Sequence, residues 1–119
     1  TSHHDGDASK QLLLAKINYF HVKLLAYFVK RLDSIKESNG GSILDNSLIA
    51  YGRGNADGQR HTHDDLPLLL FCKGGGAVNS GRHISSRGTP VTNLWLSMLD
   101  NIGANVPKLG DSTGRFSLT

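Results

Sequence analysis

A long run of helical periodicity near the start of the chain constrains the fold more than any other feature of this sequence. Apolar residues recur there at steps of three and four: Leu13, Ile17, Phe20, Leu24, Phe28, Leu32 and Ile35. This spacing predicts an amphipathic α-helix over about 9–37. Asp7 or Ser9 can cap its start, and Asn39-Gly40-Gly41 ends it. At about 1.5 Å per residue the helix is about 40 Å long, which is long for a freestanding small domain.

Two apolar runs in the middle of the chain predict β-strands. The first is Leu-Ile-Ala-Tyr at 48–51, which follows the turn-forming residues Asp45-Asn46-Ser47. The second covers 66–72 without a polar interruption, which is typical of a strand covered on both faces, as in a parallel sheet. The glycines at 74–76 end this run, and we interpret them as a turn.

The last third of the chain predicts one further helix, over Pro90–Ile102. Thr89 is a suitable N-cap, Pro90 fits the first helical position, and Gly103 ends the helix. The order of helix, two strands and helix predicts an α/β layered fold. Two strands make a poor sheet, because three or more are usually needed for stability. We therefore expect residues 1–119 to be a single partial domain, completed by the remainder of a parent chain or by a second copy.

Composition and charge exclude several classes of protein. The formal net charge is +3 and the cationic residues are scattered, which gives no basis for a nucleic-acid-binding surface. Anionic substrates remain compatible with this charge. No apolar run approaches the roughly 20 residues that cross a bilayer, so no membrane span is predicted. The single cysteine, Cys72, is interpreted as a small buried hydrophobe. The abrupt start at Thr1 leads us to expect an excised chain.

Metal-ligand side chains gather in two segments of the sequence. One is His61-Thr62-His63-Asp64-Asp65, directly before the second apolar run, with Asp57 a short distance upstream. The other is His3-His4-Asp5, before the long helix. In α/β proteins ligands bind in loops at strand ends, and imidazole and carboxylate groups suit zinc, manganese or iron. The pattern predicts a divalent-metal site.

Other interpretations of the same residues stay open. The two histidines at 3–4 can be the remnant of a tag, and 61–65 can be a solvated loop whose Asp64 or Asp65 caps neighbouring backbone. His21 lies within the predicted long helix and is interpreted as a packing or surface residue. The similarity of 64–76 to ββα-metal nucleases is faint, since no hairpin and following short helix are predicted. No Gly-x-Ser-x-Gly sequence exists, so a serine-hydrolase triad is not supported.

Several separated stretches, taken in order, resemble one family. Ser2-His3-His4 matches the second half of an HxxSHH motif. The other matching stretches are 44–47, 61–67, 74–76, 81–83, Thr89-Pro90 with Asn93-Leu94, and Leu109-Gly-Asp-Ser-Thr113. Together they resemble the bacterial HxxSHH-motif proteins, a family of uncharacterised function that is similar to the alkaline phosphatase and sulfatase superfamily. The resemblance implies that the chain is the C-terminal part of a layered alkaline-phosphatase-like domain, and that it is periplasmic or extracellular.

The resemblance also implies a function. We expect part of a metal-dependent hydrolase-like protein acting on phosphate or sulfate esters, either small molecules or polymers. The metal ligands would come from His3, His4, Asp57, His61, His63 and Asp65. Arg53 or Arg82 would bind the substrate anion. The nucleophile would lie outside this chain. The Asp-His pair of the superfamily is absent from Ala50-Tyr51-Gly52, which favours the alternative of an exported, non-catalytic binding protein on a hydrolase-derived scaffold.

Overall fold

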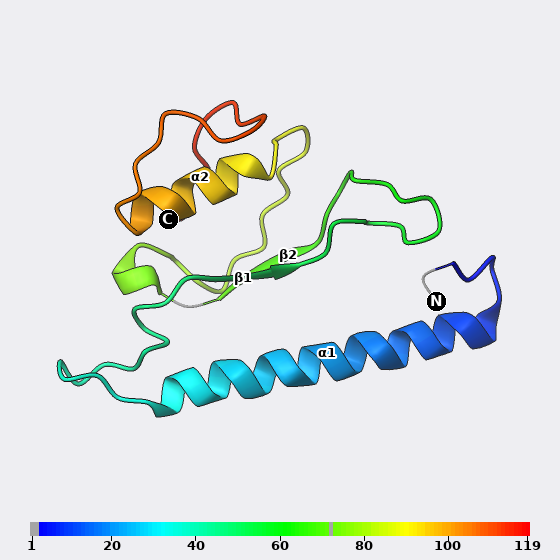
Figure 1. Cartoon of the computed structure of the whole chain (residues 1–119), viewed down its shortest axis with the longest axis horizontal. Helices are drawn as coiled ribbons and strands as arrows, with labels where there is room; N and C mark the ends of the chain where they lie inside the picture. Colours follow the sequence, from blue (N-terminus) through cyan, green and yellow to red (C-terminus); the bar gives the residue numbers. More distant parts are fainter. Residues whose placement is uncertain (1–2, 72) are drawn as a thin grey trace. The chain divides into compact units, whose positions relative to one another are not determined.

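The computed structural model describes residues 3–71 and 73–119, and within them the chain is a mixed α/β protein (Figure 1). Its elements in order are helix α1 (Ala8–Ser34), strands β1 (Ile49–Gly52) and β2 (Leu68–Phe71), a 3-10 turn (Gly74–Gly76) and helix α2 (Thr92–Asn101). The predicted order of elements is therefore confirmed. The predictions for Ser2 and Cys72 lie outside the described residues.

Helix α1 begins as predicted and ends earlier than predicted. The carboxylate of Asp7 accepts hydrogen bonds from the backbone N–H groups of Ser9 and Lys10, which makes Asp7 the N-cap. The helix ends at Ser34 because Ile35 takes an extended conformation. The N–H of Ile43 then donates to the carbonyl of Ile35, so residues 35–43 fold back as a tight turn instead of adding a helical turn.

The apolar side chains of α1 remain largely exposed. No residue of the helix is buried, and Phe20 and Tyr27 are 58% and 71% exposed. By length and composition α1 could cross a membrane, with a mean hydropathy of 1.3 over its best window. Signal sequences and the core helices of soluble proteins meet the same criterion, so the absence of a membrane span stays a prediction.

The strands form a two-stranded antiparallel sheet, β1 beside β2. The expectation of a parallel-type strand covered on both faces is wrong, because Leu69 of β2 is 53% exposed. The run at 66–72 is apolar, but β2 occupies only Leu68–Phe71. Each strand has one neighbour in the sheet, and the exposure of Leu69 shows that one face of β2 is open to solvent.

The chain divides into two compact units. The first consists of Thr1–Ile43 and Ala50–Leu69, and the second of Leu44–Ile49 and Leu70–Thr119. The first unit contains α1 and the loop that joins β1 to β2. The second contains α2 and the C-terminal segment. The grouping of 1–119 as one partial domain stays a prediction.

Helix α2 carries the small core of the second unit. Leu96 is 1% exposed, and the neighbouring polar residues Asn93 and Ser97 are also buried. The predicted start of this helix is wrong by two residues: it begins at Thr92, and its N-cap, Val91, has helical backbone angles and no capping side chain. It ends at Asn101, one residue before the predicted end, and Gly103 follows with a positive φ of 80°.

The C-terminal segment is fastened to α2 by buried polar groups. The side-chain amide of Asn93 accepts from the N–H of Thr113 at 2.9 Å and donates to its hydroxyl at 3.2 Å. The hydroxyl of Ser97 accepts from the N–H of Phe116 at 2.8 Å. Two stretches that carry the family resemblance, 89–94 and 109–113, thus meet in space. Their contacts give these motif residues a structural role.

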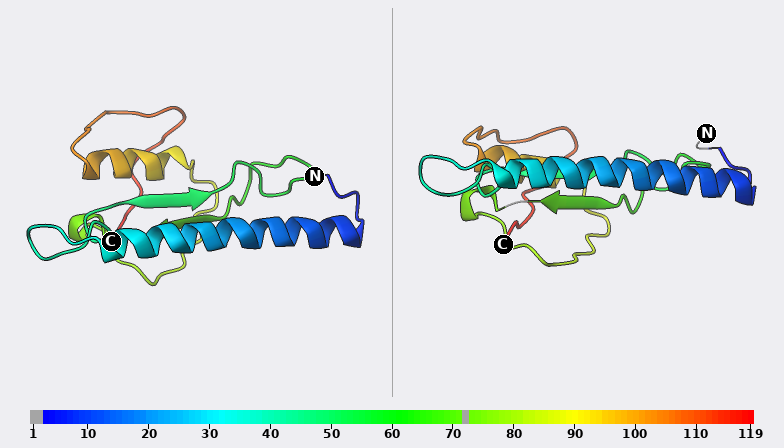
Figure 2. Two further views of the ribbon diagram at one scale, coloured as in Figure 1. Left: turned by 60° about the horizontal axis from the view of Figure 1, so that its bottom comes forward. Right: turned by 90° about the horizontal axis from the view of Figure 1, so that it is seen from below.

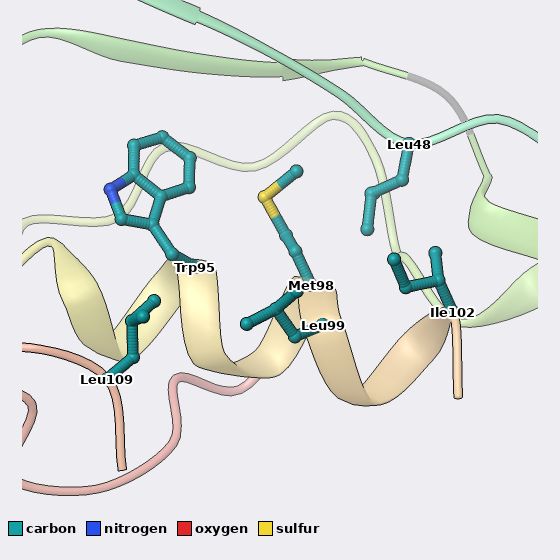
Figure 3. A pocket seen from close by; sticks show the side chains of 6 residues that line it. All are labelled: Leu48, Trp95, Met98, Leu99, Ile102 and Leu109. Atoms are coloured by element: carbon teal, nitrogen blue, oxygen red, sulfur yellow. The ribbon is translucent and has the colours of Figure 1, made fainter. Parts of the chain in front are cut away.

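An open apolar depression of about 360 Å³ lies on the second unit (Figure 3). Its lining consists of six apolar side chains: Leu48, Trp95, Met98, Leu99, Ile102 and Leu109. Trp95, Met98 and Leu99 come from α2, and Ile102, the C-cap of this helix, is 70% exposed. The lining offers no titratable group, so this depression is not a candidate for the predicted metal chemistry.

Candidate functional site

The N-terminal segment lies beside the loop that joins β1 to β2, both within the first unit (Figure 2). Here the rings of His3 and His61 face each other, with their Nε2 atoms 3.2 Å apart. The ring centres are 5.0 Å apart and the planes are inclined by 27°. The two histidines are 58 positions apart in sequence. The expected meeting of these two segments is therefore found.

A second contact joins the same two segments. The backbone N–H of Asp5 donates to Oε1 of Gln59 at 3.2 Å, and Nε2 of Gln59 donates to Oδ1 of Asp5 at 2.7 Å. Each partner lies two positions from the histidine on its own segment, His3 or His61. The contact is exposed to solvent, but its two hydrogen bonds fix both the separation and the direction of the chains.

Asp57 organises the loop from within. Its Oδ1 accepts from the N–H of Gln59 at 2.7 Å and from the N–H of Arg60 at 3.3 Å. These backbone hydrogen bonds, that of Gln59 above all, lower the pKa of the Asp57 carboxyl below its usual value. The N–H of Asp57 donates to the hydroxyl of Thr62, which closes the turn. One carboxylate oxygen is thus committed to the turn, and the other lies 3.9 Å from Arg60.

The other two histidines of the predicted set differ in which ring nitrogen can bind a cation. Nδ1 of His63 lies 2.6 Å from the carbonyl oxygen of Gly54, which can only accept, so Nδ1 carries the hydrogen and Nε2 keeps its lone pair. Nδ1 of His4 accepts from the N–H of Gly6 at 3.2 Å, so a neutral His4 carries its hydrogen on Nε2. His63 is the better prepared ligand of the two.

The left-handed backbone region is populated in both segments. Among the residues that the structure describes, the non-glycine residues with positive φ are Asp5 (48°), His61 (54°) and Asp65 (51°). Such angles are uncommon except for Asn, Asp and His, and they accumulate at sites that the surrounding contacts hold in place. Asp65 itself is exposed, and no contact described in the structure brings it to the histidine pair.

The two arginines predicted to bind an anion both donate to backbone carbonyls. Arg53 donates from one terminal nitrogen to the carbonyl of Ala56 at 3.0 Å. In the second unit, Arg82 donates from Nε to the carbonyl of Asn79 and from a terminal nitrogen to that of Leu118, at 3.0 and 2.8 Å. Arg82 is thus engaged by two carbonyls and holds the C-terminal segment, whereas Arg53 keeps more of its donors for a ligand.

The predicted ligands do not all converge. Within 3–71 and 73–119, no group of three or more His, Cys, Asp or Glu side chains is placed to hold a metal ion. The pair that is brought together, His3 and His61, is half of a tetrahedral ligand set. The sequence could not indicate which of the predicted ligands converge, because the positions of the rings depend on turns whose backbone angles no sequence pattern predicts.

Sequence reasoning missed three residues of this site: Gln59, Thr62 and Gly54. Gln59 carries no charge and belongs to no motif, and Gly54 contributes only its carbonyl oxygen. A weak signal existed in Asp57-Gly58, a dipeptide typical of turns, since an Asp at that position often accepts hydrogen bonds from the backbone two residues onward.

Comparison with protein families, with curated proteins and with solved structures finds no match for the chain.

Proposed function

We propose that this chain binds a divalent metal ion through Nε2 of His3 and His61. We further propose that it belongs to a hydrolase-like protein acting on phosphate or sulfate esters. The observation that carries the proposal is the 3.2 Å separation of the two Nε2 atoms. Two nitrogens bound to one tetrahedral zinc at about 2.0–2.1 Å lie about 3.3 Å apart. The residues therefore fit a shared cation.

The ring positions support the same conclusion. If each lone pair points to a common cation, the two ring centres of such a pair lie about 5 Å apart. A straight N–H···N hydrogen bond of the same length would place them about 5.5 Å apart. The separation of 5.0 Å between the centres of His3 and His61 is compatible with the bent arrangement around a cation.

The chemistry of the surrounding donors favours zinc or manganese. Imidazole nitrogen suits zinc, copper, iron and nickel, and carboxylate oxygen extends the range to manganese. The second Asp57 oxygen and Nε2 of His63 are further donors that the loop offers, and His4 can join only by changing its hydrogen-bonding partner. In this proposal Asp57 either contributes an oxygen or orients the loop that carries His61.

A bound metal ion would polarise a phosphoryl or sulfuryl oxygen. The chain's own contribution would be to hold the ion and to bring a cationic side chain to the anion. Arg53 lies in the loop that carries His61, and its remaining N–H groups can donate to an anionic oxygen in a bidentate fashion. The remaining ligands and the nucleophile would come from the remainder of a parent chain or from a second copy.

A non-catalytic role is the second candidate, and a specific observation favours it. Catalytic zinc sites hold the ion with three protein ligands and keep one position for water. Only two imidazoles converge among the residues that the structure describes. An exported protein that kept the scaffold and binds an anionic molecule without turning it over is compatible with this partial set.

Metal titration of the full 119-residue chain tests the proposal. Isothermal titration calorimetry with Zn²⁺ and Mn²⁺ would compare the unmodified chain with His3→Ala, His61→Ala and the double variant. His21→Ala is the matched control, because His21 is exposed in the middle of α1. We expect the affinity of His3→Ala and of His61→Ala to be at least tenfold weaker than that of the unmodified chain. The affinity of the control should be unchanged. Equal affinity in His61→Ala and in the unmodified chain would contradict the proposal.

Because the nucleophile would lie outside this chain, the ester assay uses the parent protein that the proposal implies, and there a panel of phosphate and sulfate esters distinguishes the two candidates. Turnover that requires added metal and is lost in His61→Ala would favour the hydrolase. Metal-dependent retention of an ester without turnover would favour the binding protein.

A further inference from the structure

We propose that Gln59 is a positioning residue for the His3–His61 pair: its side-chain amide sets the separation of the two rings. This inference rests on the proposed metal site and assigns a role to a residue that is not itself a ligand. The clasp is defined here as the two hydrogen bonds between Asp5 and Gln59, of 3.2 and 2.7 Å.

The clasp is placed symmetrically with respect to the two histidines. Asp5 follows His3 by two residues, and Gln59 precedes His61 by two residues. Two residues of chain cover at most about 7 Å, so the clasp lies within one side-chain length of the ring pair on both segments. The two segments are therefore joined at two nearby points, by the clasp and by the contact between the His3 and His61 rings. The stretch between these two points is called the interval below.

Gln59 is held through both its backbone and its side chain. Its backbone N–H donates to Asp57 at 2.7 Å, and the loop is closed by the 2.8 Å hydrogen bond from the N–H of Ala56 to the carbonyl of Thr62. Across the interval, the side-chain amide of Gln59 accepts from the N–H of Asp5 and donates to its carboxylate, which a carboxylate in place of the amide cannot do. A single side chain therefore fixes both distance and direction.

The backbone at both ends of the interval needs such support. Asp5 and His61 both have positive φ, of 48° and 54°. Asp and His tolerate this region better than other residues with side chains, and neighbouring contacts help to hold them there. Without the clasp, Asp5 and the N-terminal segment lose their connection to Gln59, and the His3 ring loses its fixed position opposite His61. The pair would then have to be assembled by the metal, at a cost in affinity.

Cobalt(II) binding to the full chain tests the role, because its visible absorption reports coordination geometry as well as occupancy. We expect Gln59→Ala to bind Co²⁺ tenfold to a hundredfold more weakly, as is typical when a residue that orients a ligand is lost. We also expect its absorption bands to change in position or intensity. Gln59→Glu should behave in the same way, because a glutamate has no side-chain N–H group to donate a hydrogen bond to the Asp5 carboxylate. Asn18→Ala, an exposed amide within α1, is the control.

Two variants of Asp5 separate positioning from folding. Asp5→Ala removes the hydrogen bond of 2.7 Å and leaves the backbone one, whereas the amide oxygen of Asp5→Asn still accepts from Gln59. We expect Asp5→Asn to restore most of the affinity that Asp5→Ala loses, at equal helicity by circular dichroism. This comparison also decides the case if Gln59→Ala does not fold.

The outcomes distinguish this inference from the proposed function. The role of Gln59 would be overturned, and the metal site left intact, by the following result. Gln59→Ala binds Co²⁺ within twofold of the unmodified chain and with the same spectrum, whereas His61→Ala does not bind it. Loss of affinity in Asp5→Asn equal to that in Asp5→Ala would also overturn it, since a carboxylate ligand would then explain the loss. No dependence of Co²⁺ binding on His61 would overturn both.

Discussion

Nδ1 of His63 lies 2.6 Å from the carbonyl oxygen of Gly54. A carbonyl accepts and never donates, so this contact selects the neutral His63 tautomer with hydrogen on Nδ1 and a lone pair on Nε2. Metal-ligating histidines commonly have this arrangement, with the second ring nitrogen donating to a carbonyl or carboxylate. His63 thus carries a property of a ligand although it does not contact the His3–His61 pair.

We predict opposite neutral tautomers for His63 and His4. Nδ1 of His4 accepts from the N–H of Gly6 at 3.2 Å, which places the hydrogen of its neutral ring on Nε2. Long-range ¹H–¹⁵N correlation spectra of the chain above the titration range of histidine distinguish the two forms. His63 should show a protonated Nδ1 and His4 a protonated Nε2. The same tautomer in both rings would contradict the assignment.

The end of β1 requires a glycine at position 52. A Cβ atom there would clash with Cδ2 of Leu68 and would lie 3.0 Å from the carbonyl oxygen of Pro67, so the Leu68 side chain would have to turn and the end of the loop would have to shift slightly. We predict that Gly52→Ala lowers the free energy of unfolding by about 1–3 kcal/mol. Urea denaturation followed by circular dichroism measures this. Gly54→Ala is the control, because its Cβ meets nothing within 4 Å.

The order and type of the main elements could be predicted because local periodicity determines them. The three- and four-residue spacing of α1 and the cap at Asp7 are properties of short stretches, and both are confirmed. The parallel-type strand was wrong, because hydrophobicity alone does not indicate which partner a strand pairs with. The start of α2 was wrong because Thr89 is a suitable cap by residue type, but its N–H donates to Ser86 in a separate turn.

The candidate site could be predicted only in part. Its two segments were identified from residue types, and the contact between His3 and His61 is found. The clasp by Gln59 was missed, because a neutral amide acquires its role only when a segment 54 positions away is brought against it. The commitment of Arg82 to the carbonyl of Leu118 was missed for the same reason, since the partner is a backbone atom with no signature in the sequence.

The attachment of the C-terminal segment to α2 depends on Asn93. Its buried amide makes two hydrogen bonds to Thr113, and its removal would leave the N–H of Thr113 without this acceptor and open a gap beside Ser97. We predict that Asn93→Ala lowers the free energy of unfolding by about 2 kcal/mol. Asn105→Ala, at an exposed position of the same unit, should change it by less than about 0.5 kcal/mol. Equal destabilisation by the two variants in urea denaturation would show that Asn93 has no special role.

The ion pair of Asp100 and Arg115 makes the free energy of unfolding depend on pH in the acidic range. Nε of Arg115 lies 2.6 Å from Oδ2 of Asp100, and this hydrogen bond holds the pKa of the Asp100 carboxyl below its ordinary value of 3.8. Because the folded-state pKa is the lower one, the stabilisation is fully present above pH of about 4 and is lost as the pH falls through the folded-state pKa.

We therefore predict a smaller loss of stability on acidification when this pair is removed. Between pH 5 and 2 the urea midpoint should fall less steeply for Asp100→Asn and for Arg115→Gln than for the unmodified chain. Arg115→Gln should also be less stable at neutral pH, because Arg115 donates to the carbonyl of Val106 as well. The change of the urea midpoint with pH reports the protonation of Asp100, whereas the loss of the hydrogen bond to Val106 lowers the midpoint equally at every pH. Parallel curves of midpoint against pH for all three proteins would contradict the prediction.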